Sequence, residues 1–211
     1  MTKIFGYGED AFTLWALKKH IPRIFKEYQD KTTSSKCLVF YRPSFGRRSR
    51  KDSSIFGEFD AIIVSLKNIY LVESKWDNLS EFKKDELVLR GEQALRHQIL
   101  VWYLTHWDKK YSKRWASFVK EHQNDFKFNG KAMPRKDSLL AINLEFVLTK
   151  SLEHCKTISY KNIKNVLLFF YNRQKRSKPP IKSSKPFKMI PIDYGKEIEG
   201  NFVTLFGDDD K

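Results

Sequence analysis

The sequence predicts an α/β fold in which a mixed β-sheet is flanked by α-helices. Short apolar runs rich in β-branched and aromatic residues, the pattern of buried strands, alternate with longer segments of helical periodicity. Hydrophobic residues make up 41% of the 211 residues, which is enough for a substantial core. We expect one domain over residues 1–207, with a basic helical and loop region inserted at about 108–160 and a disordered tail at 208–211.

The N-terminal part of the chain predicts a helix and then a strand. Residues 8–29 carry apolar side chains at helical spacing, and Glu9 lies in the first turn, where the helix dipole favours an acid. Pro22 is expected to kink or split this helix. Residues 36–43 predict a strand that ends at its proline.

The remaining elements follow from the same patterns. A hairpin of two apolar strands is predicted at roughly 57–65 and 68–76. After it the sequence predicts a helix over 86–107, a helical piece near 111–122, a segment at 138–154 that is ambiguous but favours helix in its second half, a strand over 165–172, a loop over 173–186 and an edge strand over 187–194.

The charge of the chain is strongly positive. Forty Lys and Arg against 25 Asp and Glu give a formal net charge of +15 and a pI near 9.7. An excess of this size favours a polyanionic partner, most often nucleic acid. Two cysteines exclude a disulfide framework and favour a reducing compartment, and no apolar run reaches the ~18 residues of a membrane span. We therefore expect a cytoplasmic protein without a membrane partner.

The predicted hairpin contains three charged residues where a buried strand would be apolar: Asp60, Glu73 and Lys75. Burying a charge is costly unless it is paired or bound to a metal. If the turn centres between Leu66 and Lys67, Asp60 lies directly opposite Glu73. If it centres one residue later, Asp60 faces Lys75, and in both registers the three charges share one face.

Two carboxylates on directly opposite strand positions repel each other, and a divalent cation removes that repulsion. Mg²⁺ is commonly bound by one or two carboxylates together with waters and phosphate oxygens. A lysine beside such a site can hold a phosphate and orient a water. A structural ion pair at the end of the sheet is the alternative interpretation.

These residues resemble the PD-(D/E)XK nuclease superfamily, which has the restriction-endonuclease-like fold. Asp60 matches the aspartate of the motif, and Glu73, Ser74 and Lys75 match its E-x-K, although Phe59 replaces the usual proline before the aspartate. The resemblance implies that the two acids and the Ser74 carbonyl bind Mg²⁺, for which Mn²⁺ can substitute, and that the lysine assists the attacking water.

The resemblance also implies supporting residues on the flanking helices. Many members carry a glutamate on the helix before the hairpin, which Glu9 would supply. Some carry a glutamine on the following helix with an aromatic residue one turn later, which Gln98 and Trp102 resemble, while Gln93 is the competing glutamine.

Two basic segments without acids are the predicted contacts to phosphate. Six Lys and Arg lie between residues 36 and 51, and seven lie between 173 and 188. We expect nucleic-acid contacts from Arg47, Arg48, Arg50, Lys51, Arg173, Lys175 and Arg176. The aromatic residues between 102 and 115 are expected to be mostly core. The alternative is that one or two of them stack on unpaired bases, which would favour single strands or branched DNA.

The leading hypothesis is a metal-dependent nuclease, a Mg²⁺-dependent deoxyribonuclease acting as an endonuclease, with DNA as its partner and a protein partner or a homodimer as a further expectation. The residues leave open DNA versus RNA and endonuclease versus exonuclease action. An alternative is a nucleic-acid-binding subunit of a larger machine with weak cleavage or none. A third is an enzyme specialised for one DNA structure or sequence.

Overall fold

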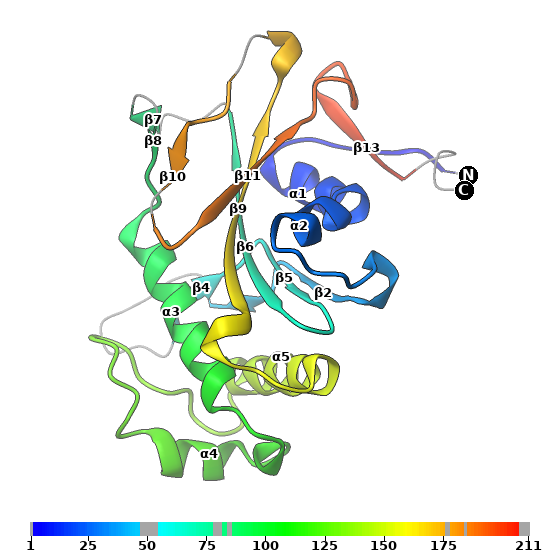
Figure 1. Cartoon of the computed structure of the whole chain (residues 1–211). Coiled ribbons are helices and arrows are strands. Elements are labelled where there is room, and N and C mark those ends of the chain that lie inside the picture. Colours follow the sequence, from blue (N-terminus) through cyan, green and yellow to red (C-terminus); the bar gives the residue numbers. More distant parts are fainter. Residues whose placement is uncertain are drawn as a thin grey trace. The chain divides into compact units, whose positions relative to one another are not determined.

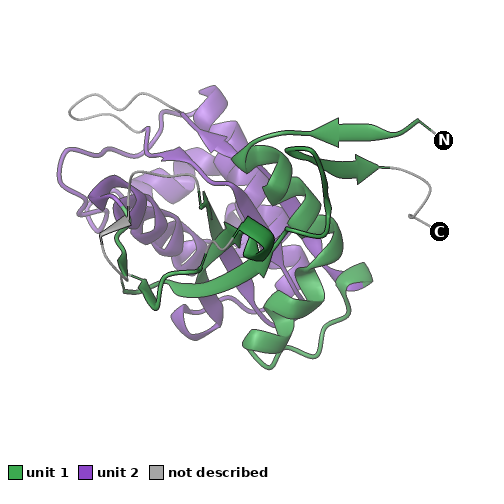
Figure 2. Ribbon diagram, turned by 90° about the horizontal axis from the view of Figure 1, so that it is seen from above, with its two compact units in different colours: residues 1–35, 72–89, 165–211 green, residues 36–71, 90–164 purple. Residues whose placement is uncertain are grey.

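A computed structural model describes residues 2–46, 55–77, 82–83, 86–175, 178–183 and 185–206. The protein is mixed α/β, with a five-stranded mixed sheet and five α-helices in this described part. The chain forms two compact units, coloured separately in Figure 2. Unit 1 comprises residues 1–35, 72–89 and 165–211, and unit 2 comprises residues 36–71 and 90–164. The expected single domain with an insertion stays a prediction.

The five-stranded sheet has the strand order β11-β9-β6-β5-β2 (Figure 1). Its strands are β2 (Leu38–Tyr41), β5 (Ala61–Val64), β6 (Ile69–Trp76), β9 (Ile163–Tyr171) and β11 (Lys188–Asp193). Strand β2 pairs antiparallel with β5, and β11 pairs parallel with β9, so the sheet is mixed as predicted. The predicted edge strand with its proline is confirmed, because β11 ends the strand order.

Unit 1 adds two helices and two small sheets to its part of the main sheet. Figure 1 shows β13 lying alongside the N-terminal segment of the chain. The strand orders are β1-β13-β12 and β10-β8-β7. These elements are β1 (Ile4–Gly6), α1 (Glu9–Lys19), α2 (Ile21–Glu27), β7 (Phe82–Lys83), β8 (Glu86–Leu87), β10 (Lys182–Ser183), β12 (Ile198–Glu199) and β13 (Phe202–Phe206).

The helix predicted over 8–29 is split as expected. Helix α1 ends at Lys19 and α2 begins at Ile21, with Pro22 in the first turn of α2. A proline is tolerated there because the N–H groups of a first helical turn have no partner within the helix. The short strands β1 and β13 were not predicted.

Unit 2 holds the hairpin turn and three helices. Its further elements are β3 (Ser44–Phe45), β4 (Gly57–Glu58), α3 (Gly91–His106), α4 (Trp115–His122) and α5 (Leu139–Cys155). The prediction that a helix begins near 86 is wrong, because residues 86–87 form β8 and the helix begins at Gly91. The segment at 138–154 is helical from Leu139 onward, and the Ser138 hydroxyl caps it by accepting the Ala141 N–H at 3.2 Å.

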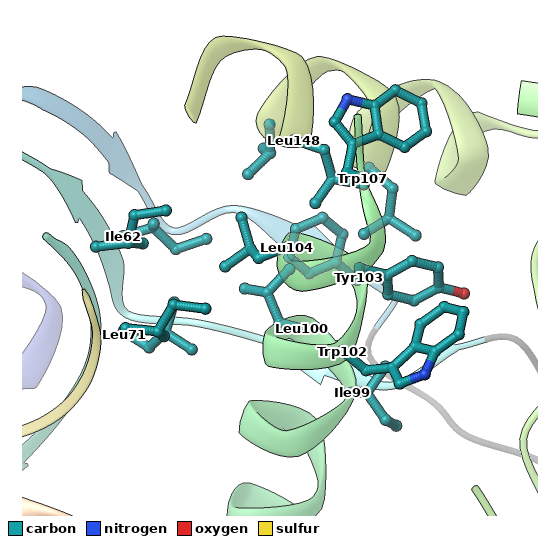
Figure 3. Packing of buried hydrophobic residues seen from close by; sticks show 14 of the residues in the cluster. Ile62, Leu71, Ile99, Leu100, Trp102, Tyr103, Leu104, Trp107 and Leu148 are labelled. Atoms are coloured by element: carbon teal, nitrogen blue, oxygen red, sulfur yellow. The ribbon is translucent and has the colours of Figure 1, made fainter. Parts of the chain in front are cut away.

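The core of unit 2 is dominated by α3 (Figure 3). Leu100, Tyr103 and Leu104 of α3 are at most 1% exposed and belong to one cluster with Ile62, Leu71 and Leu148. The expectation that the aromatic residues between 102 and 115 are core is confirmed. All of them are buried: Trp102, Tyr103, Trp107, Tyr111 and Trp115.

Unit 1 has its own buried apolar contacts. Leu87 of β8 clusters with Leu167 and Phe169 of β9 and with Phe187, which precedes β11. Among the described residues, none of the helices combines the length and the apolar composition that a bilayer crossing demands.

Candidate metal and nucleic-acid site

The turn between β5 and β6 is held by its own hydrogen bonds. The Ser65 N–H donates to the Asn68 carbonyl at 2.8 Å, and the Ser65 hydroxyl accepts the N–H groups of Lys67 (3.1 Å) and Asn68 (2.8 Å). The turn therefore centres between Leu66 and Lys67, which is the first of the two predicted registers.

The acid and the serine of the E-x-K motif are buried. Glu73 and Ser74 in β6 are both 0% exposed, and Lys75 keeps 13% of its side chain exposed. Glu73 and Lys75 lie on the same face of β6, because strand side chains alternate. The predicted burial of the acidic position is therefore confirmed.

Asp60 lies in unit 2, in the bend before β5. It is half-buried, and its backbone carbonyl accepts the Arg42 N–H at 3.1 Å. This bond extends the β2–β5 pairing by one residue. The backbone of Asp60 is thus fixed at the point where the strand begins.

Glu9, the first residue of α1, lies beside the lysine of the motif. Its Oε1 is 3.6 Å from the Lys75 Nζ, and the backbone N–H of Trp76 also donates to its carboxylate. Burial raises the pKa of Glu9, while the Lys75 charge and the Trp76 hydrogen bond oppose that rise. The structure therefore brings together two predicted site residues, Glu9 and Lys75.

The predicted glutamine lies in α3 of unit 2. Gln98 is exposed, and the competing Gln93 accepts the Arg90 N–H at 3.1 Å, which caps the helix. Trp102 is part of the core. His97 of the same helix is 1% exposed and packs against Phe59 with 4.9 Å between ring centroids.

Two of the predicted phosphate-binding residues are visible and exposed. Arg173 and Lys175 lie on a short 3₁₀ helix that directly follows β9, and the Lys175 Nζ donates to Asn201 Oδ1 at 3.2 Å. The other predicted contacts lie outside the described residues: Arg47, Arg48, Arg50, Lys51 and Arg176.

A pocket of about 260 Å³ in unit 1 was not predicted from the sequence. Its lining residues are Tyr7, Trp76, Asp77, Lys175, Tyr194 and Asn201. They come from four distant segments of the chain, so no sequence window contains them. The only local signal was that Trp76 and Asp77 directly follow the E-x-K motif.

The floor of this pocket is a chain of hydrogen bonds. The Trp76 indole donates to the Tyr194 hydroxyl at 2.8 Å, and that hydroxyl donates to Asp77 Oδ1 at 3.0 Å. The Asn172 N–H donates to the other oxygen of Asp77 at 3.1 Å. Burial raises the pKa of Tyr194 to about 12, so this hydroxyl stays protonated at neutral pH.

The donor atoms of the hairpin suit Mg²⁺ in kind, since it prefers carboxylate and carbonyl oxygens. Glu73 is a carboxylate that directly follows the buried run Ile69–Val72 of β6, and Ser74 has its backbone carbonyl beside it. Across the described residues, no three or more His, Cys, Asp or Glu side chains gather closely enough to hold a metal ion. A site with two acids needs no such group, because the remaining ligands of Mg²⁺ are usually water and phosphate.

Comparisons of this chain with known protein families, curated proteins and solved structures give no match.

Proposed function

We propose that this chain is a metal-dependent nuclease: a Mg²⁺-dependent deoxyribonuclease that hydrolyses phosphodiester bonds as an endonuclease, with Mn²⁺ able to replace Mg²⁺. The observation that carries the proposal is the 3.6 Å pair of Lys75 with Glu9, next to the buried Glu73 on the same face of β6. A buried acid and a lysine on one strand face, in a chain of charge +15, suit the handling of a phosphate.

In this proposal Asp60, Glu73 and the Ser74 carbonyl hold the metal. The bound ion would polarise a phosphoryl oxygen and lower the pKa of a water molecule. Lys75 holds a non-bridging phosphate oxygen with its ammonium group and orients the water. The water oxygen bonds to phosphorus, one P–O ester bond breaks, and the departing oxygen takes up a proton.

Glu9 acts as a positioning residue for the lysine. Its carboxylate holds the Lys75 Nζ at 3.6 Å and is itself fixed by the Trp76 N–H. Fixing the lysine in this way lowers the entropy that is lost when it engages a phosphate. Gln98 is proposed as a supporting residue that contacts the substrate, which its exposed place on α3 permits.

The exposed Arg173 and Lys175 support DNA as the partner, together with the basic residues that lie outside the described part of the chain. A protein partner or a second copy is also proposed. The exposed apolar side chains Leu139, Ile142 and Phe146 of α5 support it, since such a group often marks an interface. The free cysteines Cys37 and Cys155 are compatible with the proposed cytoplasmic location.

The alternative function is a nucleic-acid-binding subunit of a larger DNA-processing machine. The complete burial of Glu73 favours it, because a sealed carboxylate would not reach a substrate phosphate without a change in conformation. This alternative predicts salt-sensitive DNA binding that needs no metal and survives Asp60→Asn.

A cleavage assay distinguishes the two functions. Plasmid, linear duplex, single-stranded and branched DNA are incubated with Mg²⁺, Mn²⁺ or EDTA and the wild type, Glu73→Ala or Lys75→Ala. We expect cleavage only with the metals, and a loss of about 10²-fold or more in each variant. Lys67→Ala is the matched control, since this lysine is exposed at the turn of the same hairpin. Equal cleavage by the wild type and both site variants would refute the nuclease proposal.

A further inference from the structure

The wall of the pocket in unit 1 is aromatic and open to solvent. Tyr7 lies between β1 and α1 and is 57% exposed. Its ring contacts Trp76 edge-on at 5.5 Å between centroids and Phe202 of β13 at 5.6 Å. Phe202 is itself 48% exposed. An exposed ring supported by two others is a rigid platform whose outer surface is available for stacking.

A positively charged side chain lines the same pocket. Lys175 lines it and is held by the side chain of Asn201 at 3.2 Å. It belongs to the exposed 3₁₀ turn Arg173–Lys175. Aromatic platforms with adjacent cations are the usual means by which proteins bind unpaired nucleic acid, because bases stack while the backbone follows the positive charge.

The size of the pocket limits its occupant. About 260 Å³ is slightly below the range of about 300–1,000 Å³ that is typical for drug-sized ligands. A single nucleobase is a suitable occupant, whereas the stacked pairs of a duplex are not. The base would have to leave its duplex, or belong to a single strand, before it could enter.

The floor of the pocket offers little base-specific recognition. The Tyr194 hydroxyl accepts the Trp76 indole N–H and donates to one oxygen of Asp77, and the other oxygen of Asp77 accepts the Asn172 N–H. These polar groups are therefore already hydrogen-bonded within the protein. An occupant would be held chiefly by stacking, which tolerates any base. Little discrimination between bases is therefore expected.

The pocket is linked to the proposed site through one strand. Trp76 lines the pocket, follows Lys75 directly and donates its N–H to the Glu9 carboxylate. Resting on the proposed function for the class of substrate, we infer that this pocket binds one unpaired base of a DNA strand, stacked on Tyr7, with Lys175 on an adjacent phosphate. The substrate is then single-stranded, flapped or branched DNA rather than intact duplex.

Binding measured without metal tests this inference separately from cleavage. Fluorescence anisotropy in EDTA is used to titrate a labelled 12-nucleotide oligothymidine and a blunt hairpin duplex of similar charge. Tyr7→Ala is expected to weaken oligothymidine binding by about 5- to 100-fold, which corresponds to the loss of one stacked base. Its effect on duplex binding is expected to stay below about twofold.

Two variants serve as controls. Tyr7→Phe keeps the ring and should retain the affinity of the wild type. Tyr160→Ala removes another exposed tyrosine, 63% exposed in unit 2, and should change neither affinity. Lys175→Ala should make the salt dependence of oligothymidine binding shallower by about 0.7 in the log–log slope.

The inference is overturned if Tyr7→Ala leaves oligothymidine binding unchanged, or if it weakens single-strand and duplex binding equally. An unchanged salt slope in Lys175→Ala would overturn the phosphate contact. Selective loss of single-strand binding in Tyr7→Ala, together with no Mg²⁺-dependent cleavage by the wild type, would support the pocket and refute the nuclease proposal.

Discussion

The Lys75 Nζ lies 3.6 Å from Glu9 Oε1, so the lysine of a strand and the first residue of a helix meet across 66 positions of sequence. The pair is partly buried, with 13% and 30% of the two side chains exposed. This pairing fixes the ammonium group on the face of β6 that also carries Glu73.

The raised pKa of Glu9 predicts a specific pH dependence of stability. A carboxyl whose pKa is higher in the folded state stabilises that state below the pKa of the unfolded chain, near 4.5, and this contribution is lost as the pH rises through the folded pKa. The free energy of unfolding of the wild type relative to Glu9→Gln should therefore fall as the pH rises above about 4.5. Urea unfolding of both proteins from pH 4 to 8 measures this difference.

Asp10→Asn is the matched control for Glu9→Gln, since it removes an exposed carboxylate from the same helical turn. This control separates the effect of Glu9 burial on the pH dependence of stability from the effect of the helix dipole, which acts on both carboxylates. A difference between the wild type and Glu9→Gln that stays constant, or grows with pH, would contradict the assignment.

If Glu73 binds Mg²⁺, the ion should stabilise the folded protein, and this stabilisation should depend on Glu73. At a Mg²⁺ concentration 100 times the Kd, the wild type should gain about 2.7 kcal/mol. For a chain of this length that gain is a rise in Tm of roughly 5–10 °C. Glu73→Gln should lose most of it, because an amide is a weaker ligand than a carboxylate. Thermal unfolding in EDTA and in Mg²⁺ gives both shifts, and an equal shift in the two proteins would rule Glu73 out as a ligand.

Asp60→Asn should remove the same Mg²⁺-dependent stabilisation and the cleavage activity. The double variant with Glu73→Gln should be little worse than either single variant, because ligands of one ion act as a unit. Glu58→Gln is the neighbouring control: Glu58 bonds to Arg42 at 2.9 Å, and its loss should cost roughly 1 kcal/mol without changing the metal effect. A metal response that Asp60→Asn leaves intact would remove Asp60 from the site.

The segment at about 108–160, which was expected as an insertion, contributes Phe118 of α4 to the core of unit 2. Phe118 is 0% exposed, and its ring lies 5.0 Å from that of Trp107 and 6.1 Å from that of Tyr103. Phe118→Ala should lower the free energy of unfolding by about 3–5 kcal/mol. Phe146→Ala, at a 56% exposed position of α5, should cost less than about 1 kcal/mol. Denaturant unfolding compares them, and similar small losses in both would show that α4 does not support the core.

Much of the central sheet could be predicted because its strands are buried and carry strong local signals. The β5–β6 hairpin and β9 are rich in β-branched and aromatic residues, which favour strands. The sequence left the turn open between two positions, and Ser65 secures the observed one by accepting two backbone N–H groups.

Other elements could not be predicted because tertiary partners decide them. Strand β8 is two residues long and exists by pairing with β7 and β10, while its residues alone favour the helix that was expected there. Strand β1 pairs with β13 about two hundred residues away, at positions such as Phe5 and Thr204.

The candidate site shows the same division. The acids and the lysine of the hairpin were found because a charge in an apolar strand is conspicuous. The pocket in unit 1 was missed, because Tyr7, Tyr194 and Asn201 are ordinary residues until the fold brings them together.

The measurement that most directly tests the central claim is the anomalous scattering of Mn²⁺ in crystals of the wild type. The account predicts one strong peak about 2.0–2.3 Å from a carboxylate oxygen of both Asp60 and Glu73 and from the Ser74 carbonyl, and no such peak in Glu73→Gln crystals. A catalytically active wild-type protein whose crystals bind Mn²⁺ elsewhere, with neither acid as a ligand, would contradict it.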